Sequence, residues 1–400
     1  MPRNRWNLGT KGLLALGPLV ALLAGGSATP TAGAAGKKAG PQPGVIAVEG
    51  PMSGEQASTG IDMADGAQLA VNEINAGGGV GGLTLTLVRV DDRATAAGGL
   101  SAARKAIASH SFAVVGPFNS SVGVANLPVY KRAGLPIVRL TSNVKTEGFG
   151  VTTQPMDSQV APVEIHEITQ VLHASRPAII YDTSTYTAGI ASQVKAGLAK
   201  AGDPVVSYVP VKEGQANYNA ALQKVVSSHP GLLYISAYGT EAGTIAKEAS
   251  ALGNTGKCFI EGVAAQGPAF VTAATQAVAS ACLSSGVPSA ELFAGAAHYV
   301  SAYETAFHTA PGTWGTFTYD SVEILANAIK QAGWHQKPVI AAMDHTTNYA
   351  GITGPITIAP STGNRVQSTV VILDINSGGN YVIDPQWAAA VGFPLPTTGG

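Results

Sequence analysis

Polar side chains follow two apolar segments of this chain, at points where a ligand could be held. Asn119 and Ser120 follow FAVVGPF, and Thr141 and Asn143 follow or adjoin the end of LPIVRL. Hydroxyl and backbone N–H groups at the start of a helix can hold a carboxylate. The same residue types also cap helices routinely, so each position taken alone is more simply explained as a cap.

Later in the chain, two tyrosines and a glutamate could complete such a binding site. Tyr186 and Tyr238 come after the apolar segments PAIIYD and GLLYIS, and Glu261 comes directly after KCFI. Aromatic rings can enclose the apolar part of a small ligand, and a carboxylate can pair with an ammonium group in a dry cleft. A solvated carboxylate and two core or surface tyrosines are the simpler alternatives for each residue alone. Their occurrence as a set favours binding.

The sequence lacks the residue spacings typical of hydrolase, nucleotide-binding and metal sites. There is no G-x-S-x-G or G-x-x-x-x-G-K-[ST] motif, and the eight histidines show no metal-ligand spacing. Gly77, Gly79 and Gly82 match G-x-G-x-x-G, but they follow a helical segment and precede a strand, which predicts a helix end and a tight turn. Asp91 and Asp92 could bind a metal, but no further ligand is apparent, so hydrogen bonding within a loop is expected. We therefore expect no enzyme, no cofactor and no metal site.

Short strand-like segments alternate with helix-like segments along the whole chain. GVIAVEG, the helical IDMADGAQLAVNEIN and LTLTLVRVDD form a first β-α-β unit. Apolar strands then recur between alanine-rich helical stretches, as in FAVVGPF, LPIVRLT, PAIIYDT, DPVVSYVPV, PGLLYISAY, KCFIEGV and STVVILDI. Strands rich in Val and Ile that alternate with helices predict an α/β fold with parallel sheets buried on both faces.

The alternation of strands and helices is interrupted in three places, near residues 151–160, 286–293 and 361–370, which we call seams. They predict two lobes built from separated segments. The first lobe comprises residues 44–154 and 289–366, and the second comprises 155–288 and 367–387, followed by a tail, 388–400. Lobes joined by such crossings can hinge and close on a ligand.

The amino terminus is typical of a secretory signal peptide. Arg3, Arg5 and Lys11 precede the apolar GLLALGPLVALLAGG, and Ala32 and Ala34 form an A-x-A cleavage site. We expect residues 1–34 to be removed and residues 35–43 to form a flexible leader; an uncleaved anchor is the alternative. No cysteine follows that could carry a lipid. The mature chain is therefore expected in the periplasm or outside the cell.

The net charge of the chain bears on whether it binds nucleic acid, and its two cysteines bear on whether it contains a disulfide. The formal charge is −1, and it becomes −4 without the three basic residues of the signal segment, which argues against nucleic acid. The two cysteines, Cys258 and Cys282, lie in strand-like segments of one β-α-β unit and could meet as neighbours. A disulfide is expected in an oxidising compartment, with two buried thiols as the alternative.

From Gly44 to Asp384 the chain resembles the leucine/isoleucine/valine-binding family of type I solute-binding proteins, which serve ABC importers. The motifs that carry the resemblance are, in order, GPMSG with GAQLAVNEINAGGGV, VRVDD, VVGPFNSS, GLPIVRLTSN, YDTSTYTAG and FIEGVA. The resemblance implies the fold of a type I periplasmic binding protein. In that fold, two lobes, each a mostly parallel sheet flanked by helices, are joined by three hinge crossings around the ligand.

The resemblance also implies roles for the candidate residues of the first lobe. In amino-acid-binding members, the ligand carboxylate lies on the loops that match Ser120 and the turn from Thr141 to Asn143. The ligand ammonium lies near the backbone oxygen that matches Thr141 and near the acid that matches Glu261. These assignments predict a site for a zwitterion.

Aromatic residues complete the implied site, with two departures. Tyr186 and Tyr238 match tyrosines that close from the second lobe, and Trp314 corresponds to an aromatic beside the side-chain pocket. Asn143 stands where the family often has Thr, and an amide can still donate to a carboxylate. A family aromatic is replaced near Thr59, which makes the wall of the pocket smaller and more polar.

We therefore expect a monomeric, extracytoplasmic substrate-binding protein of an ABC importer. It would capture an amino acid, branched-chain ones included, or a close analogue, and present it to a permease in the membrane. A sensing module that feeds a receptor and a binder of amides or small carboxylates are alternatives. An exported hydrolase is disfavoured by the missing catalytic motifs.

Overall fold

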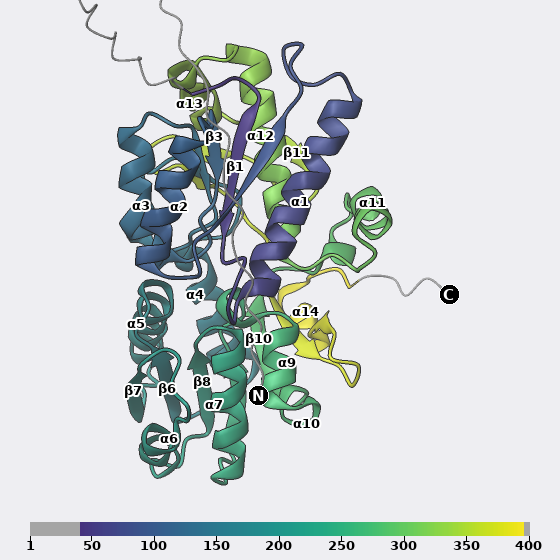
Figure 1. Ribbon diagram of the computed structural model, residues 1–400. Coiled ribbons are helices and arrows are strands. Elements are labelled where there is room, and N and C mark those ends of the chain that lie inside the picture. Colours follow the sequence, from purple (N-terminus) through teal and green to yellow (C-terminus); the bar gives the residue numbers. More distant parts are fainter. Residues whose placement is uncertain (1–40, 396–400) are drawn as a thin grey trace, which may run out of the picture. The chain divides into compact units, whose positions relative to one another are not determined.

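Two β-sheets with helices on both faces make up the structure, a computed structural model that describes residues 41–395 (Figure 1). The α/β fold expected from the sequence is confirmed. The predicted signal peptide, residues 1–34, lies outside the described residues, as do residues 35–40 and 396–400.

The first sheet is parallel throughout and has the order β2-β1-β3-β4-β5. Alternate residues of its first strand face opposite helical layers, as the two-residue period of a strand requires. Ile46 and Val48 pack with Met63 of α1, whereas Ala47 packs with Leu127 of α3. The strands are β1 Val45–Gly50, β2 Thr86–Asp91, β3 Ala113–Val115, β4 Ile137–Arg139 and β5 Val151–Thr152.

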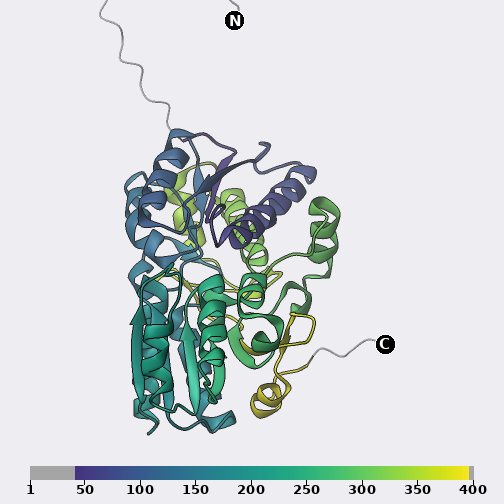
Figure 2. The ribbon, with the colours of Figure 1, turned by 60° about the horizontal axis from the view of Figure 1, so that its bottom comes forward.

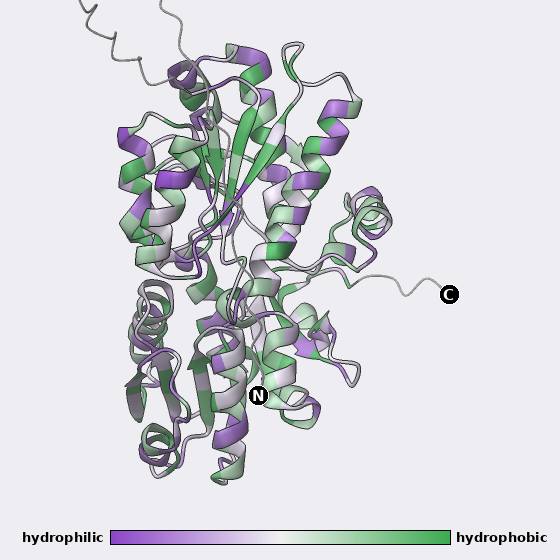
Figure 3. Cartoon of the chain, viewed as in Figure 1, coloured by the Kyte–Doolittle hydropathy of each residue, from purple (hydrophilic) through white to green (hydrophobic). Residues whose placement is uncertain are grey.

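Helices on both sides explain why these strands are almost wholly apolar. In Figure 1, α2 and α3 cover one face, and α1 and α12 cover the other. Figure 3 shows the strands of this sheet in hydrophobic green, with hydrophilic purple on the helices around them. The helices of this half are α1 Ala57–Ala76, α2 Ala96–Ala108, α3 Ser120–Arg132, α11 Ala297–Phe307, α12 Trp314–Ala332 and α13 Gln336–Asp344.

The second sheet has the order β16-β15-β10-β9-β8-β6-β7. Figure 2 shows its teal strands with helices packed around them. Its strands are parallel except for β15 and β16, which come from the end of the chain and pair antiparallel. The strands are β6 Pro177–Asp182, β7 Ser207–Val211, β8 Leu232–Ser236, β9 Lys257–Ile260, β10 Cys282–Gly286, β15 Val371–Ile375 and β16 Tyr381–Ile383.

Two helical layers also enclose this sheet. Ile180 and Ile235 pack with Ile245 of α7 on one face, and Ile179 and Tyr234 belong to the cluster that contains α5 on the other. A π-helical turn, Glu167–Val171, directly continues α4. The helices are α4 Asp157–His166, α5 Thr185–Lys200, α6 Asn219–Val226, α7 Gly239–Ala251, α8 Gly262–Ala265, α9 Pro268–Ala274, α10 Gln276–Ala279 and α14 Pro385–Val391.

Three connections run between the elements of the two sheets. The first follows β5, the second follows β10 and the third follows β14. β14 belongs to the second of two small hairpins. These are β11 Tyr349–Gly351 with β12 Gly354–Ile356, and β13 Ile358–Ala359 with β14 Asn364–Arg365. Short 3-10 turns, Val144–Thr146 and Ala290–Leu292, complete the elements. The residue bounds proposed above for the two lobes stay a prediction.

A disulfide joins Cys258 of β9 to Cys282 of β10, with the sulfur atoms 2.06 Å apart. The two residues lie directly opposite each other in the register of these parallel strands. Adjacent strands of one β-α-β unit thus bring the thiols together across a sequence separation of 24. Within residues 41–395, no helix is long and apolar enough to cross a membrane.

Candidate functional site

A small cavity of about 10 Å³, room for roughly one water molecule, lies where segments of both halves meet. The first-sheet half contributes residues that follow β3, β4 and β5, and the second-sheet half contributes the starts of α5, α7 and α8. Loops at the carboxyl ends of parallel strands are where open α/β sheets hold ligands. The lining residues are Phe118, Ser120, Ser142, Gln154, Tyr186, Tyr238 and Val263.

The start of α3 presents hydrogen-bond donors at this cavity. Ser120 is its first residue and lines the cavity, and its Oγ accepts from the backbone N–H of Asn143 at 3.2 Å. The hydroxyl proton of Ser120 can therefore be donated elsewhere. Asn119 makes no capping hydrogen bond: its Nδ2 donates to Gln56 Oε1 at 2.9 Å, and its buried Oδ1 has no hydrogen-bond partner among residues 41–395. The first turn of α3 thus has the partial positive charge of a helix start without a side-chain cap.

Thr141 lies behind the cavity instead of lining it. It is fully buried, and its hydroxyl donates to Thr146 Oγ1 at 2.8 Å. Its backbone oxygen, the atom implied as an ammonium acceptor, accepts from Arg139 Nη1 at 2.9 Å. A carbonyl oxygen has a second lone pair, but the cationic donor beside it makes this oxygen a poor acceptor for another cation.

Asn143 contacts the neighbouring elements rather than the cavity. Its Oδ1 accepts from the N–H of Lys145 at 3.1 Å and so caps the 3-10 turn, which is the simpler alternative considered above. Its Nδ2 donates to Asp157 Oδ2 at 3.0 Å and to the backbone oxygen of Thr185 at 3.2 Å. The latter bond, with the bond from Thr185 N to Ser121 Oγ at 2.9 Å, joins the two halves beside the cavity.

Tyr186 and Glu261 form one hydrogen-bonded unit at the opposite wall. The Tyr186 hydroxyl donates to Glu261 Oε1 at 2.9 Å. Glu261 is fully buried and caps α8, accepting from the N–H groups of Val263 at 3.1 Å and Ala264 at 3.0 Å. Burial raises the pKa of Glu261 to about 7, although these hydrogen bonds oppose the rise. Tyr186 and Val263 therefore separate its carboxylate from the cavity, and both residues donate hydrogen bonds to it.

Aromatic rings form the third wall. The rings of Phe118 and Tyr238 have centroids 6.5 Å apart, and Phe118 lies 5.1 Å from Trp314. Trp314 is buried behind Phe118 and does not itself line the cavity. Thr59 is half-buried in α1 and is also absent from the lining.

Sequence reasoning missed Gln154 as a site residue. It follows β5 in the first connection between the halves and is buried against the cavity. Its Nε2 donates to the backbone oxygen of Leu140 and to Ser142 Oγ, the latter at 2.8 Å. No residue among 41–395 donates to its buried Oε1. Its place in the seam near residues 151–160 was the available signal, since a crossing segment passes between the halves.

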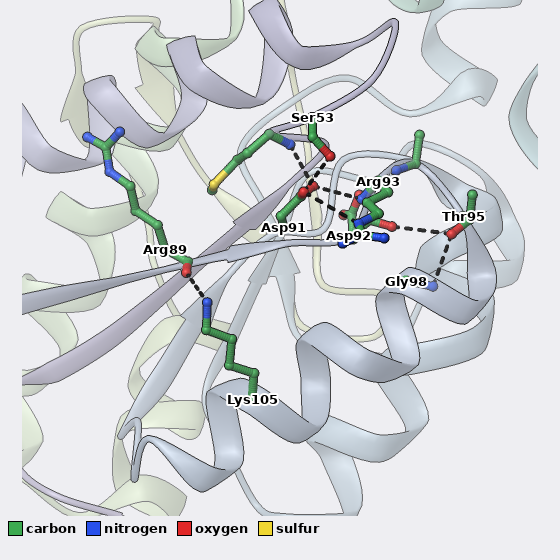
Figure 4. Close-up of polar contacts among 10 residues, drawn as sticks. Ser53, Arg89, Asp91, Asp92, Arg93, Thr95, Gly98 and Lys105 are labelled. Atoms are coloured by element: carbon green, nitrogen blue, oxygen red, sulfur yellow. Dashed lines mark hydrogen bonds and ion pairs between the residues drawn. The ribbon is translucent and has the colours of Figure 1, made fainter. Parts of the chain in front are cut away.

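Asp91 and Asp92 make hydrogen bonds within loops, as expected from the sequence. The Asp91 carboxylate accepts from the Ser53 hydroxyl and the N–H of Arg93 (Figure 4). It also accepts from the N–H of Met52, and Asp92 accepts from the N–H of Ala94. No cluster of metal-ligating side chains occurs in the described part of the chain. The glycine string ends α1 at the C-cap Gly77 and then forms a tight turn, bridged between Val80 and Leu83.

The chain belongs to the periplasmic binding protein family, whose sequence model matches residues 43–380. An amino acid binding protein from Pseudomonas aeruginosa is 29% identical over 296 residues, which cover 72% of this chain and 79% of that protein. A Leu/Ile/Val-binding protein from Citrobacter freundii is 28% identical over 213 residues, 52% of this chain and 58% of that protein. The predicted resemblance is thereby confirmed, and the chain spans somewhat over half the length of the latter relative.

A solved structure extends the comparison to three dimensions. The branched-chain amino acid transporter substrate-binding protein LivJ from Streptococcus pneumoniae, solved in complex with isoleucine, is 26% identical, with a TM-score of 0.75. The match covers 84% of this chain and 97% of LivJ. The type I periplasmic binding fold therefore extends over nearly all of the described residues.

Proposed function

We propose that this protein is the extracytoplasmic substrate-binding protein of an ABC importer and that it captures an α-amino acid or a close analogue. The observation that carries the proposal is one cavity with donors on one wall and an acid behind the other. Ser120 and the uncapped start of α3 form the first wall, and Tyr186 with Glu261 forms the second. The family membership and the amino-acid-binding relatives support the same ligand class.

The ligand carboxylate is held at the start of α3. The Ser120 hydroxyl and the N–H groups of the first turn donate to it, and the helix dipole favours its charge. Within residues 41–395, no lysine or arginine lines the cavity. The anion is therefore bound by dipoles, which hold a carboxylate without a competing ion pair.

The ligand ammonium is stabilised by the charge of Glu261, which lies behind Tyr186 and Val263 and is otherwise unfavourable in its buried position. Tyr186 donates to this carboxylate alongside the N–H groups of Val263 and Ala264, and it lines the cavity with Tyr238. The aromatic rings of Phe118 and Tyr238 enclose the remaining atoms of the ligand.

Closure of the two halves on the ligand produces the form that a membrane permease recognises. The bonds from Thr185 to Ser121 and Asn143 are the contacts that such a closed form retains. The signal-like amino terminus supports export, and the closed protein acts without covalent chemistry.

The test is a thermal-shift screen of the mature chain, residues 35–400, against the twenty L-amino acids, their amides and small carboxylates. A ligand that binds only the native state raises the melting temperature. We expect a concentration-dependent rise with one or more amino acids and confirmation by titration calorimetry. A rise with carboxylates that lack an amino group, and none with amino acids, would contradict the proposal.

A further inference from the structure

The fully buried carboxyl group of Glu164 is linked through Ser285 to the backbone beside Glu261, whose carboxyl group is also fully buried. Glu164 Oε1 accepts from the hydroxyl of Ser285 at 2.7 Å. The Oγ of Ser285 in turn accepts from the N–H of Gly262 at 3.0 Å, and Gly262 directly follows Glu261. One side chain therefore separates Glu164 from the backbone of the acid behind the cavity.

Each carboxyl group also accepts from a buried tyrosine. Tyr234 donates to Glu164 Oε2 at 2.9 Å, and Tyr186 donates to Glu261 Oε1 at the same distance. Tyr186 lines the cavity. Both acids therefore lie in one buried polar cluster around the start of α8, between the cavity wall and α4.

This network contains no cation. None of the ion pairs within residues 41–395 includes Glu164 or Glu261. Burial raises the pKa of Glu164 well above its usual range, and the charge of Glu261 raises it further. The other titratable groups that face the two acids are also acids or phenols, namely Asp157, Asp182, Tyr186, Tyr234 and Tyr238.

We propose that Glu164 and Glu261 hold a shared proton in the ligand-free protein and release it when the ammonium group of an amino acid binds at Glu261. Two buried, uncompensated carboxylates in one network cannot both be ionised cheaply. A proton supplies the missing positive charge while the site is empty. The ligand ammonium then supplies it, and the proton passes to solvent. Glu164 is a positioning residue in this exchange, because it acts on the ligand only through Glu261.

The exchange couples affinity to pH. Binding releases a proton, so mass action makes binding tighter as pH rises and weaker as pH falls. Across the range in which the pair titrates, the dissociation constant rises by up to about tenfold for each unit of acidification. A carboxylate ligand without an amino group has no such release.

The inference rests on the proposed amino-acid ligand, and titration calorimetry can separate the two. The probe is the amino acid that binds most tightly among the twenty, measured at pH 7 in buffers of different ionisation enthalpy. The wild-type protein is expected to release a large fraction of one proton per ligand. Glu164→Gln is expected to bind the same amino acid with a smaller release, because Glu261 then ionises without a neighbouring acid.

Glu167→Gln is the matched control. Glu167 follows α4 and is equally buried, and its pKa is raised to about 7 by burial and by Asp384 rather than by Glu261. Proton release by this variant is expected to equal that of the wild type. Infrared spectroscopy of the ligand-free protein supplies a second readout, the C=O stretch of a protonated carboxyl group that ligand addition removes and Glu164→Gln alters.

Binding without proton release would overturn the exchange and leave the proposed function intact. An equal loss of release in Glu164→Gln and Glu167→Gln would also overturn it, since a general effect of buried acids would explain both. If none of the twenty amino acids binds, the proposed function fails and the exchange fails with it.

Discussion

Replacing Glu261 by Gln tests the charge behind the cavity without changing the volume of the side chain. The amide keeps an acceptor oxygen for the Tyr186 hydroxyl and for an N–H at the start of α8, so the fold is expected to persist. What disappears is the negative charge opposite the ligand ammonium.

The expected loss follows from burial. Glu261 is 0% exposed, so an ammonium beside it is removed from water and depends on the carboxylate for its charge compensation. Leaving one charge of a buried pair without its partner costs about 3 kcal/mol, which corresponds to a dissociation constant roughly 100-fold larger. The measurement belongs at about pH 8, because the pKa of Glu261 is raised to about 7 and the wild-type side chain is then mostly ionised.

The assay is titration calorimetry with the tightest-binding amino acid, with Glu241→Gln as the control. Glu241 is also buried, with a pKa raised to about 8, but it binds the Tyr218 hydroxyl at 2.6 Å and does not line the cavity. We expect its variant to bind like the wild type. Equal affinities of the wild type and Glu261→Gln at this pH would refute the ammonium site.

Four further outcomes are expected. Ser120→Ala should weaken binding by about 1–2 kcal/mol in calorimetry, because a charge-assisted hydrogen bond to the ligand carboxylate is lost; a lower melting temperature with unchanged affinity would assign the hydroxyl to helix stability alone. Gln154→Leu should lower the ratio of threonine to valine affinity, since the buried Oε1 can accept from a ligand hydroxyl; an unchanged ratio in competition assays would exclude that contact. Replacing Cys258 and Cys282 together by Ser should lower the free energy of unfolding in urea by about 3 kcal/mol, because the closed loop spans 24 residues; equal midpoints would contradict this. The ligand-free protein should lose stability as pH rises through about 7–8, because a raised pKa such as that of Glu241 stabilises the fold only while the acid is protonated; calorimetric melting temperatures that rise over this range would contradict it.

Local patterns in the sequence were sufficient for the fold. The apolar run GVIAVEG predicted a strand buried on both faces, and the structure places Ile46 and Ala47 against different helical layers. The glycines after α1 predicted a helix end because their neighbours were a helix and a strand. In both cases the deciding interactions lie within a few residues of each other or repeat along one element.

The roles of the candidate side chains depended on distant partners. Asn119 and Asn143 both looked like caps, yet only Asn143 caps; the Nδ2 of Asn119 donates to Gln56 from another loop, and its Oδ1 has no partner among residues 41–395. Thr141 was expected to offer its backbone oxygen, but Arg139, two residues away, already donates to it. Such competition among hydrogen-bond partners is decided by which side chains the folded chain brings within reach.

By itself, the sequence determined the alternation of strands and helices, the family, and the positions at strand ends where a ligand could be held, because periodicity and loop chemistry are local properties. Only the tertiary structure decided that Ser120, Gln154, Tyr186 and Tyr238 share one cavity and that Glu164 stands in the same network as Glu261. Glu164 and Ser285 are 121 residues apart in the chain. Their hydrogen bond exists only because α4 packs on the sheet that contains β9 and β10, which no local pattern specifies.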